Sequence, residues 1–436
     1  MKRIFVIILL FTTSLHFGQP ITNNDVIKEI QTLLETNYIF LDKAKESNTH
    51  LNELVKNDFF TKMSPDEFTT AVTEELQKIT KDKHLKLWPP REKAKKVSEK
   101  SFVGNLSRYQ TPMLRGFQLF ESNIGYIDLA FFGGGATHLE KIDLAMRGMQ
   151  AADAIIIDMR NNTGGSPRTV NYLSSYFFNQ ELLLNSIYSR AQDYTEELFV
   201  VDVKGVKRPK VPVYILTSKK TFSGAEDFSY TMQSRGRATI IGEVTGGGAH
   251  PTRGFLLKGG FDIGIPFART INPVTKTNWE GVGVQPDIKI SANDALEKAR
   301  NLALDKAKEY RDAFFEPLKK ALSSIESTEA TESEKETLFE QFDVLVKVKM
   351  LNESEINTLG YSYVEKNNIK SALFIFEINT RLFPNSANTW DSLAEAYLKM
   401  ENKEKATKYY EKALKMDPEG WVGENAKEML QKIKSL

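Results

Sequence analysis

Apolar positions follow three successive patterns along the chain. From Ile21 to about Leu87 they recur at three- and four-residue steps, as at Ile27, Ile30 and Leu34, and this spacing predicts helices. The middle third instead contains short, largely apolar runs rich in β-branched residues, separated by helical patterns. From about Asn293 the helical spacing returns and continues towards the C-terminus. The pattern therefore predicts a small N-terminal helical subdomain, an α/β core and a C-terminal all-α region.

The middle third has the alternation of strands and helices that is typical of an α/β fold. The runs that predict strands are Ile124–Phe131, Ala154–Met159, Val211–Thr217, Ala238–Val244 and Phe261–Phe267. Helical patterns lie between them at about His138–Gln150, Arg168–Phe178 and Gly224–Ser234. Because the strand runs are largely apolar, we expect βαβ units whose strands are buried on both faces.

The C-terminal region contains an internal repeat. Gly360, Tyr363, Ala372, Phe376 and Pro384 recur 34 residues later as Ala394, Tyr397, Ala406, Tyr410 and Pro418. A 34-residue period with small residues where paired helices cross resembles tetratricopeptide repeats. We expect helical repeats over 336–436, preceded by a Ser-, Thr- and Glu-rich linker at 323–335. Such repeats would offer a docking surface for a protein partner.

The N-terminus has the features of a signal peptide. Lys2 and Arg3 precede an unbroken apolar run from Ile4 to Phe11, and small or polar residues follow. The run is shorter than the roughly 20 residues that a membrane-spanning helix needs. We expect residues 1–19 to be removed on export, which would leave a periplasmic or secreted protein without an integral membrane segment.

Composition excludes several classes of function. The 58 basic and 57 acidic residues nearly balance, so the chain has no basic footprint for nucleic acid. The chain has no cysteine, which excludes disulfides, thiolate metal sites, a cysteine nucleophile and a lipid-modified N-terminal cysteine. In the sequence, no group of His, Asp and Glu has the spacing of a metal site, so neither a metal nor a cofactor is predicted.

The strongest local signal for catalysis is a serine between a strand and a helix. The run Val211–Thr217 leads into Ser223-Gly224, and a helical pattern starts at once. A serine hydroxyl there lies at a helix N-terminus, where backbone N–H groups and the helix dipole stabilise an oxyanion. The same pattern also fits an ordinary serine N-cap, so the local sequence leaves both interpretations open.

A second signal is the pair Gly164-Gly165, which follows the apolar run Ala154–Met159. Two glycines after a strand allow a backbone N–H to approach a ligand closely, as an oxyanion hole requires. An ordinary strand-to-helix turn is the alternative interpretation.

Four segments together carry a resemblance to a known family. They are Asp158-Met159-Arg160-Asn161-Asn162-Thr163-Gly164-Gly165, Ser223-Gly224-Ala225-Glu226, Gly242-Glu243-Val244-Thr245-Gly246-Gly247-Gly248 and Trp279-Glu280-Gly281-Val282-Gly283-Val284-Gln285-Pro286-Asp287. From about Asn23 to Ile290 the chain resembles the serine peptidase family of the C-terminal processing (tail-specific) proteases, tricorn protease and interphotoreceptor retinoid-binding protein. The resemblance implies a crotonase-like (Clp-protease-like) α/β spiral core, here at 91–322, after a helical subdomain at 20–90.

The resemblance also implies a catalytic set. The lysine that serves as general base in one branch of the family is absent here, since Gly248 stands at its position. The tricorn-like branch implies His84 as the base and Glu280 as its supporting carboxylate, with Ser223 as the nucleophile. His250, which lies in a glycine-rich loop, is the alternative base.

Two functions of different classes are open at this point. The first is an exported serine peptidase that hydrolyses peptides or proteins through an acyl-enzyme. The N–H groups of Gly224 and of the Gly164-Gly165 turn would then hold the oxyanion. The second is a non-catalytic module that binds apolar ligands or peptides, as the retinoid-binding relative implies. The presence of all the implied catalytic residues favours the peptidase.

Overall fold

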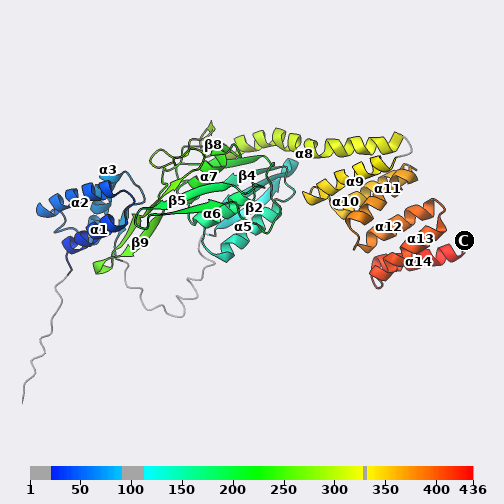
Figure 1. The fold of residues 1–436 in the computed structure, drawn as a ribbon, viewed down its shortest axis with the longest axis horizontal. Helices are drawn as coiled ribbons and strands as arrows, with labels where there is room; N and C mark the ends of the chain where they lie inside the picture. The colour runs from blue at the N-terminus through cyan, green and yellow to red at the C-terminus, as the bar shows by residue number, and fades with distance from the viewer. Residues whose placement is uncertain (1–20, 91–111, 328–330, 436) are drawn as a thin grey trace, which may run out of the picture. The chain divides into compact units, whose positions relative to one another are not determined.

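The computed structural model describes residues 21–90, 112–327 and 331–435, which form two compact units. The first unit comprises 21–90, Asn185–Glu197 and Gly247–Gly283, and the second comprises 112–184, Leu198–Gly246 and 284–435. Figure 1 labels their helices and strands. The predicted signal peptide at 1–19 and the start of the predicted core at 91–111 lie outside the described residues.

The first unit packs three helices with an antiparallel sheet. Ile27, Ile30 and Leu34, which lie on one face of the first helix, are buried in the same apolar cluster as Ile263 and Ile265 of the sheet. The predicted helical pattern of this region is therefore confirmed. The helices are α1 (Asn23–Asn37), α2 (Leu41–Lys56) and α3 (Pro65–Thr80), and the strand order is β1 (Lys86–Trp88), β10 (Asp262–Pro266), β9 (Thr252–Leu256).

The run Phe261–Phe267 was expected in the βαβ core, and this expectation is wrong. The run forms β10 of the antiparallel sheet, because a short turn closed by the Leu257 N–H and the Phe261 carbonyl connects it to β9. A connection of that length joins antiparallel strands, whereas a parallel pair needs a long crossover. A further small sheet has the order β11 (Ala268–Ile271), β5 (Leu183–Ser189), β6 (Tyr194–Phe199).

The second unit is built on a six-stranded sheet that is parallel except for β2 at one edge. Ile155 and Ile157 of the buried strand β4 pack with α5, α6 and α7 on one face, and Ile156 packs with α8 on the other. The predicted α/β core with doubly buried strands is therefore confirmed. The strand order is β12 (Ile288–Lys289), β8 (Thr239–Gly242), β7 (Val213–Thr217), β4 (Ala154–Asp158), β3 (Ile124–Leu129), β2 (Leu114–Phe120), and the helices are α5 (Ala136–Gly148), α6 (Pro167–Ser175) and α7 (Gly224–Ser234).

The long helix α8 (Ala295–Ser327) belongs to two apolar clusters. Four alanines at four-residue steps, from Ala295 to Ala307, let its first half lie close to the sheet. Leu318 and Ile325 of its second half pack instead with the helices that follow. These are α9 (Glu332–Lys347), α10 (Glu353–Glu365), α11 (Ile369–Leu382), α12 (Ala387–Lys399), α13 (Lys403–Met416) and α14 (Trp421–Ser435).

The segment predicted as a linker, 323–335, is largely helical. α8 continues to Ser327, and α9 begins after Thr331, whose side chain accepts from the N–H of Glu334 in a capping box. The Ser, Thr and Glu residues that predicted a linker here thus include the N-cap and the capping-box glutamate of a helix. The helical repeats themselves are confirmed, since Gly360 on α10 provides the close approach to Phe376 on α11 that the repeat pattern requires. Within the described ranges, none of the helices combines the length and the apolar character needed to cross a bilayer.

Candidate active site

Ser223 lies on a tight turn between the buried strand β7 and the buried helix α7. Its backbone is at φ 53° and ψ −120°, a conformation that residues other than glycine rarely adopt. The Phe222 N–H donates to the carbonyl of Asn162 (3.1 Å), which anchors the turn just before the serine. A strained serine between a strand and a helix is the geometry in which enzymes expose a nucleophilic hydroxyl.

Glu226 fixes this turn from inside the protein. Its fully buried carboxylate accepts from the Ser223 N–H (2.8 Å) and from the hydroxyl of Thr245. Thr245 in turn accepts from the N–H of Val284 (2.7 Å), so the carboxylate connects the serine to the chain that follows β8. The sequence pattern contained Glu226 in its Ser-Gly-Ala-Glu segment but did not assign it a role. A carboxylate three residues after a helix N-cap is the signal that identifies it.

The glycine turn packs directly against the serine. Gly164 and Gly165 both have positive φ values, 95° and 135°, and a Cβ on Gly164 would lie 2.6 Å from the Gly224 nitrogen and 2.7 Å from the Ser223 Cβ. The N–H of Gly164 donates to the side chain of Asn162 (2.9 Å) and is therefore already used. The role of Gly164 is to let the glycine turn approach the Ser223 turn closely. Gly165 is therefore the better candidate for the oxyanion donor of this turn.

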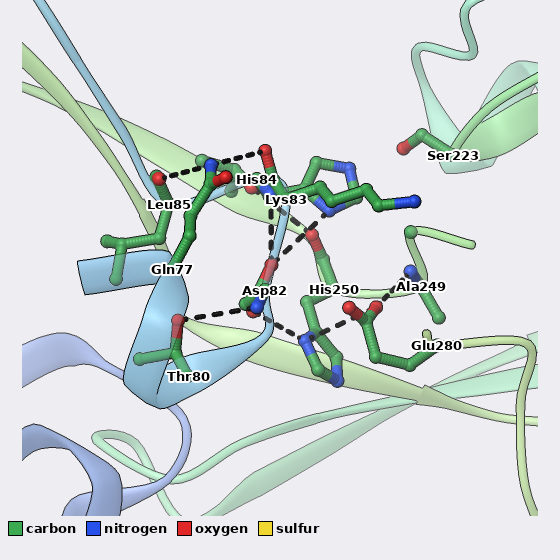
Figure 2. A network of polar contacts seen from close by, with 12 residues as sticks. Gln77, Thr80, Asp82, Lys83, His84, Leu85, Ser223, Ala249, His250 and Glu280 are labelled. Carbon is green, nitrogen blue, oxygen red and sulfur yellow. Dashed lines mark hydrogen bonds and ion pairs between the residues drawn. The ribbon is translucent and has the colours of Figure 1, made fainter. Parts of the chain in front are cut away.

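Four titratable residues gather in the first unit and are called the base cluster here: Asp82, His84, His250 and Glu280. Asp82 and His84 lie after α3, His250 precedes β9, and Glu280 follows β11, and Figure 2 shows His250 between the two carboxylates. His250 Nδ1 lies 2.7 Å from Asp82 Oδ2 and 3.5 Å from Glu280 Oε2. The other oxygen of Asp82 accepts from the His84 N–H (3.0 Å), and His84 Nδ1 lies 3.7 Å from it.

Local backbone features place these side chains. Lys81 ends α3 in the left-handed conformation (φ 57°), which turns the chain into the Asp82–His84 segment. The Ala249 N–H donates to Glu280 (2.5 Å), and this bond joins the His250 loop to the Glu280 turn. The Trp279 indole donates to the carbonyl of Gly248 (2.8 Å) and reinforces the same junction.

The two histidines have opposite electrostatic environments. Burial lowers the pKa of His84 and the nearby His250 lowers it further, although Asp82 opposes both effects. Burial alone would also lower the pKa of His250, but the hydrogen bond to Asp82 and the charges of Asp82 and Glu280 raise it above its usual value. His84 is thus favoured as a neutral imidazole, which a general base must be, and His250 as an imidazolium.

Asp82, His84 and Glu280 offer ligand atoms that lie within 4.8 Å of one another, a grouping that spacing in the sequence did not reveal. A divalent ion there would compete with existing bonds, because Asp82 already accepts from the Tyr38 hydroxyl, His84 and His250. We therefore interpret the grouping as a hydrogen-bonded network.

The predicted site residues thus fall into two groups. Ser223, Gly224 and the Gly164-Gly165 turn come together in the second unit. His84, His250 and Glu280 come together in the first unit, and Asp82, which the sequence analysis had assigned no role, lies at their centre. Its two-residue spacing from His84 would have been the only sequence signal.

Comparisons with known proteins identify three regions. Residues 123–290 match the family model described as "Peptidase family S41", and residues 21–114 match the one described as "N-terminal domain of Peptidase_S41 in eukaryotic IRBP". Residues 387–419 match the model described as "Tetratricopeptide repeat". The resemblances inferred from the sequence motifs are confirmed by these matches.

Two curated relatives each match 38% of the chain. The carboxyl-terminal-processing protease of Synechocystis sp. is 27% identical over 165 residues, which is 38% of this chain and 37% of that protein. Carboxyl-terminal-processing peptidase 2, chloroplastic, of Arabidopsis thaliana is 25% identical over 164 residues, 38% of this chain and 31% of that protein. The chain thus spans about a third of the length of these relatives. The crystal structure of a candidate peptidase from Parabacteroides merdae has a TM-score of 0.49 at 20% identity, covering 65% of this chain and 98% of that one.

Proposed function

Since residues 123–290 match the model of peptidase family S41, we propose that the chain is a serine peptidase whose nucleophile is Ser223. The observation that carries this proposal is the strained Ser223 turn, which a buried glutamate and a close-packed glycine turn hold in place. A serine that served only as a helix cap would not need a positive φ.

In the proposed reaction Ser223 Oγ attacks a peptide carbonyl while His84 takes the hydroxyl proton. His84 then gives this proton to the leaving amine, and water hydrolyses the acyl-enzyme. The lowered pKa of His84 supports this role, because the imidazole stays neutral at ordinary pH. Glu280 and Asp82 supply the negative charge that stabilises the imidazolium when it forms.

The oxyanion of the tetrahedral intermediate is assigned to the N–H groups of Gly224 and Gly165. Gly224 is the first residue of α7, so its N–H lies at the positive end of the helix dipole. Loss of one such donor typically costs about 2.7–4 kcal/mol of transition-state stabilisation.

Covalent labelling tests the assignment of the nucleophile. A fluorophosphonate probe should label the wild type and Ser234→Ala, a control on the same helix, but not Ser223→Ala. Mass spectrometry of the labelled peptide should locate the adduct on Ser223. An adduct elsewhere, or equal labelling of Ser223→Ala, would contradict the proposal.

A non-catalytic binding module is the second candidate. The observation that favours it is the match of residues 21–114 to a domain described from eukaryotic IRBP. The same probe distinguishes the two functions, because a folded chain that resists labelling and hydrolyses no peptide would be a binding module.

The proposal extends to export. The basic start and apolar run of residues 1–19 support removal of this segment during secretion. N-terminal sequencing of the protein recovered from its producing cells should give a mature chain that starts near residue 20. An intact Met1 would contradict export by this route.

The helical repeats are proposed to dock a protein substrate or partner. The second half of α8 packs with the repeats, so a deletion variant should end after Asp312, ahead of that packing. This variant should hydrolyse a small acyl substrate as the full chain does but cleave unfolded proteins more slowly. Equal rates on both substrates would contradict a docking role.

A further inference from the structure

A buried carboxylate, Asp82, and a partly buried one, Glu280, converge on a single nitrogen in the base cluster. His250 Nδ1 is 2.7 Å from Asp82 and 3.5 Å from Glu280, and the side chains of His250 and Asp82 are only 4% and 1% exposed. We propose that His250 is a positioning residue: a buried imidazolium that clamps the segment bearing His84 to the turn bearing Glu280. This inference rests on the proposed roles of His84 and Glu280.

The groups that face His250 favour a cation. A carboxylate only accepts hydrogen bonds, so the Nδ1 that lies between Asp82 and Glu280 carries a proton in either charge state of the ring, and the two nearby negative charges favour a second proton on Nε2. Two carboxylates removed from water are costly unless a positive charge is close. Arg269 on β11 opposes protonation of His250, while Tyr38 is neutral and donates to Asp82.

The geometry distinguishes His250 from the base. Its Nδ1 is taken by Asp82, and its ring packs edge-on against Phe40 with centroids 5.3 Å apart. The side chain of His84 is the more exposed of the two histidines, at 12% against 4%. A general base must be neutral and must reach the substrate, and His84 meets both conditions better.

The clamp also sets the charge that His84 experiences. With Asp82 and Glu280 ionised and His250 protonated, the cluster has a formal charge of −1, and the proton that His84 takes from Ser223 neutralises it. Deprotonation of His250 would leave the cluster with an excess negative charge and only a neutral N–H donor between the two carboxylates. We therefore expect the turnover of the wild type to fall on the alkaline side as His250 loses its proton.

Kinetics of two His250 variants test the clamp. His250→Asn keeps an amide donor for Asp82 without the charge, and His250→Leu keeps neither. We expect kcat to fall about 10-fold for His250→Asn and about 100-fold for His250→Leu, with KM unchanged, as for other residues that orient a catalytic group. In the profile of kcat against pH, the fall on the alkaline side should disappear in His250→Asn. The fall on the acid side, which reports the protonation of His84, should remain.

His50→Asn is the matched control, because His50 also contacts a carboxylate, Glu75, at 2.7 Å in the same unit but outside the base cluster. This control should keep the rate and the pH profile of the wild type. A His250→Asn variant that keeps both limbs of the profile would overturn the clamp. A silent His250→Asn with His84→Ala still active would make His250 the base and would also overturn it.

A spectroscopic test separates the clamp from the proposed function. The Nδ1 proton shared with Asp82 should give a strongly downfield proton resonance in the wild type and in Ser223→Ala, and Asp82→Asn should remove it. Absence of this resonance, or its persistence in Asp82→Asn, would overturn the clamp. An inactive wild type that shows the resonance would overturn the peptidase assignment and support the hydrogen bond between His250 and Asp82.

Discussion

The turn that bears Ser223 and the base cluster reach their geometry by different routes. At the turn, the serine, its oxyanion donor and the supporting Glu226 are neighbours in the sequence, between a buried strand and a buried helix. The base cluster instead joins residues as far apart as Asp82 and His250 through side-chain bonds between loops. A mutation at the Ser223 turn should therefore act mainly by disturbing backbone geometry. A mutation in the base cluster should act mainly by changing the balance of charges.

This difference separates the kinds of substitution to which each region is sensitive. At the turn, an added methyl group at Gly164 meets backbone atoms that cannot move without displacing α7. In the cluster, side chains of similar shape but different charge should have the larger effect.

The largest effect is expected at the proposed base. His84→Ala should lower kcat on the order of 10⁶-fold, as loss of the catalytic histidine does in subtilisin, without changing the melting temperature by much. Lys83→Ala, at the neighbouring position, is the control and should keep most of the activity. If the turnover of His84→Ala is close to that of the wild type, the general base lies outside this segment.

The next largest effect is expected at the glycine turn. Gly164→Ala should reduce kcat about 10²- to 10³-fold, because its Cβ would displace the Gly224 nitrogen from the oxyanion. Gly134→Ala is the matched control, since a Cβ there meets nothing closer than 4.0 Å. Steady-state kinetics on a small ester would check both. An active Gly164→Ala would mean that backbone geometry is not limiting at this turn.

A smaller effect is expected from Glu226→Gln. The Ser223 N–H and the Thr245 hydroxyl both donate to Glu226, because a carboxylate only accepts hydrogen bonds. An amide has only one acceptor oxygen, so one buried donor would lose its partner at a cost of about 1–3 kcal/mol. Chemical denaturation should show this loss, and the control Glu243→Gln should not. An unchanged stability would contradict the role of Glu226 in holding the turn.

A comparable effect on stability is expected at His250, and it depends on pH. The pKa of His250 is raised in the folded chain, so its contribution is fully present below the unfolded value near 6.5 and is lost as pH rises through the folded pKa. The free energy of unfolding of the wild type should therefore exceed that of His250→Asn by about 1.5–3 kcal/mol at low pH, as expected for a hydrogen bond to a charged group.

Denaturant titrations of both proteins across this pH range would measure the difference. The difference in free energy of unfolding between the wild type and His250→Asn should become smaller at alkaline pH. A gap that is constant across the range would show that the ion pair contributes no charge-dependent stability.

Features encoded by neighbouring residues were predictable. The α/β alternation, the repeats and the Ser223-Gly224 turn follow from periodicity and turn chemistry, and α7 begins and ends where its pattern predicts, at Gly224 and Ser234. The roles of Gly164 and Gly165 could not be separated in this way. Their difference depends on the side chain of Asn162, which takes the N–H of Gly164.

The main strands and helices of the α/β core, the C-terminal repeats and the serine at a helix start were predictable from the sequence, because these depend on contacts within a few residues. Only the tertiary structure decided that Phe261–Phe267 joins an antiparallel sheet and that Asp82 lies between His84 and His250. This is because the pairing of β10 with β1 and the contact of Asp82 with His250 form between segments that are far apart in the sequence. Their identity is set by which loops pack together, and no local pattern records it.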